Sequence, residues 1–126
     1  MPSLKSLYRG LSFFLPDGGA DHLYFVVTEA TGGIVATVNV SSRPCASGHK
    51  FIVKAREHPS LGNDSYLRFR EAKLANVRAL IDALNANHAR QTADASKGLI
   101  QRLMVALSEC DAVRQEVRDA IDQDLA

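Results

Sequence analysis

The sequence lacks any apolar run long enough to cross a membrane, because a spanning helix needs roughly 18 consecutive apolar residues. Residues 1–8 also lack the continuous apolar core of a secretory signal peptide. We therefore expect a cytoplasmic protein with no membrane partner.

Cysteine is scarce, since the chain contains only Cys45 and Cys110, 65 positions apart. Neither belongs to a CxxC pair or to a close cluster of His and Cys in the sequence, so we expect no metal site and no cofactor. A disulfide between them is disfavoured in a reducing compartment. We expect two unpaired thiols, and the sequence gives neither of them a role.

Common catalytic motifs are absent too. The chain has no G-x-S-x-G elbow, P-loop, H-E-x-x-H, EF-hand loop or G-x-G-x-x-G. This excludes most common enzyme classes in a chain of 126 residues, a length that fits a single domain over residues 1–126. The content of 46% hydrophobic and 23% charged residues is ordinary for a globular protein.

The net charge of +1 conceals an asymmetry between the two parts of the chain. Residues 1–74 hold nine Lys and Arg against six Asp and Glu, a difference of +3, whereas residues 75–126 hold six against eight, a difference of −2. This imbalance permits a basic patch for nucleic acid in the first part without requiring one.

The first part of the chain has the pattern of short strands. Apolar and β-branched residues dominate or alternate in five segments, which cover residues 3–15, 22–28, 34–40, 50–57 and 65–74. Gly, Pro and Asp turns separate them, and no helical segment lies between them. The pattern therefore favours a small antiparallel barrel or curled sheet over a parallel fold.

Residues 75–126 change to a helical period. We expect three helices whose apolar faces pack on the β-structure, with Thr92 or Asp94 capping the second helix. The result is an α+β fold, with a β-barrel part over residues 1–74 and a helical part over 75–126. The predicted apolar positions are Val77, Leu80, Ile81 and Leu84, then Leu99, Ile100, Leu103, Met104 and Leu107, then Val113, Val117, Ala120 and Ile121.

Two candidate groups of chemical residues lie at predicted strand ends. Asp21 and His22 follow a Gly-rich turn, and a histidine there can act as a general acid or base near neutral pH. Ser41, Ser42 and Arg43 end the third strand, where hydroxyls and a guanidinium can hold a phosphate. The alternative is that both groups are ordinary turn and loop residues.

Two further groups lie later in the first part. His58 and the pair Asp64 and Ser65 flank one loop, so the His58 and Asp64 side chains can meet there, either as a binding site or as a loop-stabilising network. Arg68 and Arg70, two apart on a predicted strand, are expected on one face. Two arginines can neutralise a phosphodiester, or they can form a solvated face with nearby glutamates.

The order of these segments resembles a known family. HLYFVVT, then GGIVATVNVSS, then FIVKAREHP and DSYLRFREAKL, followed by helices, is similar to the small SH3-like barrels of the MazF/PemK toxin superfamily over about residues 5–80. The resemblance implies metal-independent cleavage of single-stranded RNA, dimerisation through the barrel and neutralisation by an antitoxin.

The resemblance also assigns roles to residues. Ser41 and Ser42 match the Thr/Ser pair that ends the third strand in the family, whereas Asp21 and His22 stand where the family has Arg-Pro. We expect His22 to act as acid or base, Ser42 to orient the scissile phosphate with Ser41, and Arg68 or Arg70 to stabilise its charge.

Two non-catalytic alternatives remain open. The barrel can be a binding module for RNA or protein that lacks nuclease activity. Alternatively, the helical part can dock a partner protein, in which case Leu99, Ile100, Leu103 and Met104 are expected to be partly exposed in the isolated chain.

Overall fold

The computed structural model describes residues 4–17, 19–44 and 49–126. None of the described helices has the length and hydropathy that a membrane crossing requires. The strands are β1 (Ser12–Asp17), β2 (Ala20–Val26), β3 (Ile34–Ser41), β4 (Ile52–Val53), β5 (Ser65–Leu67), β6 (Lys73–Asn76) and β7 (Arg90–Thr92). The α-helices are α1 (Val77–Asn85), α2 (Lys97–Ser108) and α3 (Gln115–Leu125), and two 3-10 turns are η1 (Ala55–Glu57) and η2 (Phe69–Glu71).

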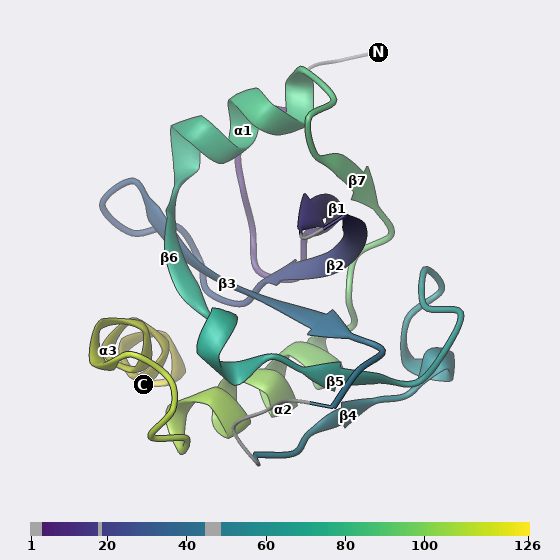
Figure 1. Ribbon diagram of the computed structural model, residues 1–126. Helices are drawn as coiled ribbons and strands as arrows, with labels where there is room; N and C mark the ends of the chain where they lie inside the picture. Colours follow the sequence, from purple (N-terminus) through teal and green to yellow (C-terminus); the bar gives the residue numbers. More distant parts are fainter. Residues whose placement is uncertain (1–3, 18, 45–48) are drawn as a thin grey trace.

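The strands form one antiparallel sheet in the order β4-β5-β3-β2-β1-β7, with β6 also pairing with β3. The long strand β3 pairs with β2 along one edge, while its other edge pairs first with β6 and then with β5. Helix α1 lies on one side of the sheet, and α2 and α3 lie on the other (Figure 1). The predicted α+β fold with an antiparallel sheet is confirmed.

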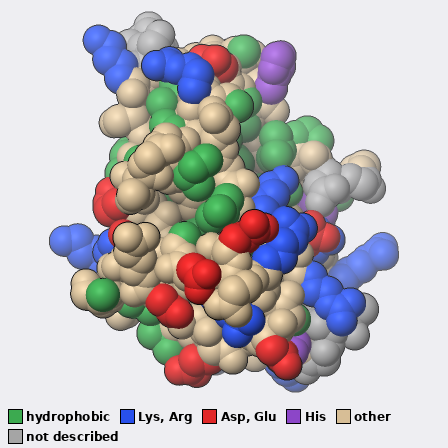
Figure 2. Space-filling view, turned by 90° about the vertical axis from the view of Figure 1, so that its left-hand side faces the viewer, with side chains coloured by type: hydrophobic (Ala, Val, Ile, Leu, Met, Phe, Trp, Pro, Cys, Tyr) green, Lys and Arg blue, Asp and Glu red, His purple; other side chains and the backbone are tan. Residues whose placement is uncertain are grey.

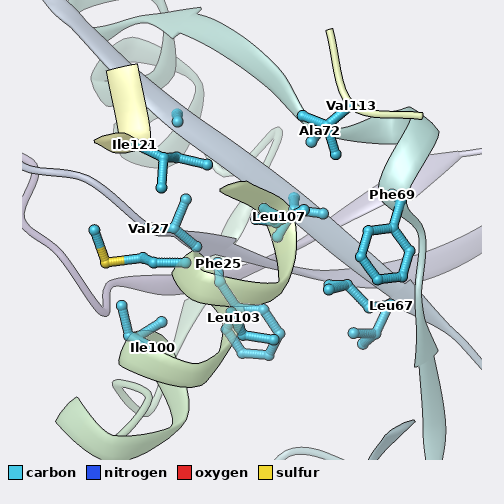
Figure 3. Packing of buried hydrophobic residues seen from close by; sticks show 14 of the residues in the cluster. Phe25, Val27, Leu67, Phe69, Ala72, Ile100, Leu103, Leu107, Val113 and Ile121 are labelled. Carbon is cyan, nitrogen blue, oxygen red and sulfur yellow. The ribbon is translucent and has the colours of Figure 1, made fainter. Parts of the chain in front are cut away.

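Alternation along β2 and β3 sends apolar side chains to both faces of the sheet. Phe25 and Val38 belong to the larger core cluster, which also includes the apolar faces of α2 and α3 (Figure 3). Tyr24 and Val35 belong to a second cluster with Ile81 of α1. Burying each Leu or Ile contributes on the order of 1.5–3 kcal/mol, so both faces of the sheet depend on the helices that cover them.

The apolar stripe of α2 was predicted correctly. Its five members are buried, with relative exposures between 0% and 2%; they are Leu99, Ile100, Leu103, Met104 and Leu107. The expectation that this stripe is partly exposed for a partner protein is therefore wrong. The predicted cap is also wrong, because Thr92 lies in β7 and Ser96 accepts the N–H of Leu99 at 3.1 Å.

Three predicted strands are much shorter than expected. Of residues 3–15, only those from Ser12 onward are in a strand, because β1 runs from Ser12 to Asp17. Residues 50–57 form a strand only at β4, because the carboxylates of Glu57 and Asp64 accept the backbone N–H groups of Lys54 and Ala55, each at 2.8 Å. A backbone donor engaged by a nearby side chain is lost to a sheet neighbour. In the predicted strand 65–74, the turn η2 separates β5 from β6.

The expected division of the chain at residue 74 is not clean. Strand β6 continues to Asn76, and β7 lies within the part expected to be helical. Residues Ser12, Phe13 and Phe14 of β1 pair with β7. The β-structure therefore draws one of its edge strands from the second part of the chain.

Candidate functional site

His22 and Ser41 lie together where the pairing of β2 and β3 ends. Leu23 pairs with Val40, and His22 and Ser41 come one position beyond that pair. Because side chains alternate between faces, both point away from the core cluster that contains Leu23 and Val40. The register therefore puts His22 and Ser41 at neighbouring positions, one residue beyond the last pair of β2 and β3.

Tyr66 of β5 lies on the same face, and Arg68 follows β5 beside β3. Tyr66 pairs with Ser41, and the backbone N–H of Arg68 donates to the Asn39 carbonyl at 3.0 Å. Leu67, between Tyr66 and Arg68, is buried in the core on the opposite face. We call this group of residues the strand-end cluster: His22, Asn39, Ser41, Tyr66 and Arg68.

The polar groups of this cluster are suited to an anionic ligand. The Ser41 hydroxyl oxygen accepts the N–H of Arg43 at 3.2 Å and retains a hydrogen that it can donate. The half-buried guanidinium of Arg68 donates to Glu71 at 3.2 Å and supplies the positive charge of the cluster. The cluster thus combines a hydroxyl donor, a cation and an imidazole.

Asn39 is the buried member of the cluster. Its side chain is fully buried, and among the described residues neither its amide oxygen nor its amide nitrogen has a hydrogen-bond partner. An unsatisfied buried polar group costs about 1–3 kcal/mol, so proteins rarely keep one without a use for it. Its backbone carbonyl accepts the N–H of Arg68.

Asp21 does not join His22, because consecutive strand residues point to opposite faces. Its carboxylate accepts from Arg90 of β7 at 2.9 Å, and the Arg90 guanidinium lies over the ring of Phe14 at 5.2 Å. Asp21 therefore links β2 to β7 through Arg90. Its carboxylate is not directed at His22.

The remaining candidate phosphate ligands, which are Ser42 and two arginines, lie at the surface. Ser42 and Arg43 follow Ser41 in a bend and are exposed, as is Arg70 in η2. The prediction that Arg68 and Arg70 share one strand face is wrong, because η2 replaces the strand there.

His58, Asp64 and Ser65 hold their own loop together. The His58 side chain is 1% exposed; its Nε2–H donates to the Ala93 carbonyl at 2.8 Å, and its Nδ1 accepts the N–H of Ser60 at 3.1 Å. Ser65 donates its hydroxyl hydrogen to the Asn63 carbonyl. His58 and Asp64 bind different partners, so the geometry matches the loop-stabilising alternative.

His58 predicts a pH-dependent stability. Burial lowers the pKa of His58, opposed by the hydrogen bond to Ala93 and by Asp94. As pH falls below about 6.5, the unfolded chain binds a proton that the folded protein resists, so the free energy of unfolding decreases on acidification. Urea denaturation between about pH 7.5 and pH 5 measures this slope.

The His58→Gln variant is expected to flatten that slope because it removes the titrating group. The His88→Gln variant, altered at an exposed histidine after α1, should keep the wild-type slope. An unchanged slope in His58→Gln would contradict the assignment.

Charge is unevenly spread over the surface that carries α3. Figure 2 shows acidic side chains gathered over the lower half of this face and a group of Lys and Arg toward its right-hand edge. Helix α3 itself contains Glu116, Asp119, Asp122 and Asp124. This acidic helix would repel the phosphate backbone of a nucleic acid.

No protein-family model and no curated protein matches the sequence. Among solved structures, the chain is similar to a chain of the MazE–MazF crystal structure from Deinococcus radiodurans, with 19% sequence identity and a TM-score of 0.53. The similarity covers 82% of this chain and 93% of the other. The predicted MazF-like fold is confirmed, and at this identity the similarity establishes the fold alone.

Proposed function

We propose that the protein is a toxin of the type II toxin–antitoxin class and cleaves single-stranded RNA at the strand-end cluster. The observation that carries this proposal is the placement of His22 and Ser41 on one face of a MazF-like sheet, with Arg68 beside β3. These three side chains supply the groups that phosphodiester cleavage requires: a proton acceptor, a hydrogen-bond donor and a cation.

In the proposed step, neutral His22 takes the proton of the ribose 2′-hydroxyl. The 2′-oxygen attacks the adjacent phosphorus, the bond from phosphorus to the 5′-oxygen breaks, and the leaving oxygen takes a proton from water. Ser41 and Arg68 donate hydrogen bonds to the phosphate oxygens, where negative charge accumulates in the transition state. Exposed Ser42, Arg43 and Arg70 contact the flanking phosphates.

Tyr66 adds a binding surface for a base. It is half-buried and pairs with Ser41 on β3 and Ile52 on β4. Single-stranded RNA is bound mainly through unstacked bases that pack on aromatic rings, at about 1–3 kcal/mol per base. A base stacked on Tyr66 positions the neighbouring phosphate at Ser41.

The partners follow from the same fold. The similar structure is named as a MazE–MazF complex, so we extend the proposal to an antitoxin partner and a homodimer formed through the sheet. Neither partner uses the apolar face of α2, which is already buried in the core.

Incubation of the purified protein with mixed single-stranded RNA in a metal chelator tests the activity. We expect cleavage by the wild type and a loss of cleavage in Ser41→Ala, whose half-buried hydroxyl is not part of the core. Intact RNA at excess protein would contradict the proposal.

A second candidate function is RNA binding without cleavage. The ion pair between Asp21 and Arg90 favours this second function, because the Asp21 carboxylate is engaged by Arg90 and does not support His22 as a base. In that case RNA binds and stays intact, and the association constant falls steeply as salt rises. A protein partner bound through apolar contacts would show little dependence on salt.

A further inference from the structure

Three potential metal ligands meet at the end of α2. His49 precedes β4, while Cys110 and Asp111 follow α2, and their ligand atoms all lie within 4.8 Å of one another. The distance from His49 Nε2 to Asp111 Oδ1 is 3.3 Å. This cluster is not visible in the sequence, because His49 is 61 positions from Cys110.

The separation of 3.3 Å between His49 Nε2 and Asp111 Oδ1 matches one edge of a tetrahedral zinc site. Zinc binds imidazole nitrogen and carboxylate oxygen at about 2.0–2.2 Å, which at the tetrahedral angle separates the two ligand atoms by about 3.3–3.5 Å. The longer zinc–sulfur bond, about 2.3 Å, widens the edges to sulfur to about 3.6 Å. The three ligand atoms lie within 4.8 Å of one another, so any separation longer than about 3.6 Å has to shorten when an ion binds.

The ligand types select the metal. Thiolate and imidazole together favour zinc over magnesium or calcium, which prefer oxygen ligands. The Cys110 residue is 5% exposed, whereas the side chains of His49 and Asp111 are 40% and 89% exposed. A thiol on the protein side and two ligands at the surface leave the fourth position open to water.

The surroundings favour a cation at this point. Cys110 lies in the turn immediately after α2, where the carboxyl end of the helix dipole carries partial negative charge. The imidazole of His49 also contacts the ring of Phe69, with centroids 5.7 Å apart, which restricts its orientation. A ligand held in place by a neighbouring ring loses less conformational entropy when it binds.

We propose that His49, Cys110 and Asp111 bind a zinc ion. The ion joins the connection that follows β3 to the turn between α2 and α3, two segments far apart in the chain. This site is separate from the strand-end cluster, and the proposal stands whether or not the protein cleaves RNA.

Cobalt(II) titration tests the site, because tetrahedral cobalt gives visible d–d bands and a thiolate ligand adds charge-transfer absorption. All proteins carry Cys45→Ser, so that Cys110 is the remaining thiol. We expect one cobalt per chain with a thiolate band, displaced by zinc. Zinc is also expected to raise the melting temperature, because it binds the folded chain.

His49→Gln and Asp111→Asn are expected to weaken cobalt binding about tenfold or more, since loss of even an outer-shell partner has an effect of that size. Both side chains are at the surface, so these variants should fold even if Cys110→Ser does not. His88→Gln should bind cobalt as the parent does. A spectrum without a thiolate band, or equal affinity in the His49, Asp111 and His88 variants, would overturn the proposal.

Discussion

Replacing His22 with alanine is expected to lower the rate of RNA cleavage by about 10²–10⁴-fold, the usual contribution of a general base. His22 is half-buried at the start of β2 and outside both core clusters, so the variant should fold. Single-turnover cleavage of a labelled oligonucleotide measures the loss of activity. Unfolding measured in parallel shows whether the variant has also lost stability.

The matched control for this substitution is His88→Ala. His88 is exposed, follows α1 and is not a member of the strand-end cluster. It should cleave at the wild-type rate. If both histidine variants cleave as fast as the wild type, His22 is not the base.

Replacing Phe25 with alanine is expected to reduce the free energy of unfolding by about 3–5 kcal/mol, as large-to-small substitutions of aromatic core residues do. Phe25 has no exposed surface and lies between the sheet and α2 (Figure 3). Its ring also meets the His58 ring edge-on, with centroids 5.7 Å apart. Urea denaturation at pH 7 measures the loss.

Val105→Ala, on the helix that covers Phe25, provides the control. Val105 is 39% exposed on α2, so its truncation should change stability by no more than about 0.5 kcal/mol. An effect of Phe25→Ala as small as that of Val105→Ala would contradict the packing of β2 on α2.

Periodicity was sufficient to predict the helices and the long strands. Helix α2 is buried along one apolar stripe and strand β3 on both faces. Burial of this kind determines the spacing of apolar residues, so it can be predicted from the local sequence. The order of the segments along the chain resembled MazF/PemK barrels, and the structural similarity confirms a MazF-like fold.

Local polar contacts account for the elements that were predicted wrongly. The alternation of residues 50–57 indicated a strand, yet Glu57 and Asp64 accept the backbone donors that pairing requires. Strand β7 carries Arg90 and Gln91 with no apolar signal, and its position depends on β1 in the distant first part of the chain.

The candidate site was predictable only in part. His22 and Ser41 could be selected from the sequence because they lie near the ends of predicted strands. The proximity of Tyr66 and Arg68 to Ser41 could not, because it depends on which strand pairs with β3. Asn39 lies between two valines of β3 and is buried as they are. A polar residue at that position of an apolar strand indicates a special role, but the alternation pattern by itself did not identify it.

Cleavage of one oligonucleotide in two forms tests the proposed function most directly. The protein, at excess and in a metal chelator, is given a single-stranded RNA and the same strand with 2′-deoxyribose at every position. We predict that wild type cuts the RNA, leaves the deoxy strand intact, and loses this activity in His22→Ala. Uncut RNA, or equal cutting of both strands, would contradict cleavage by the 2′-hydroxyl at the strand-end cluster.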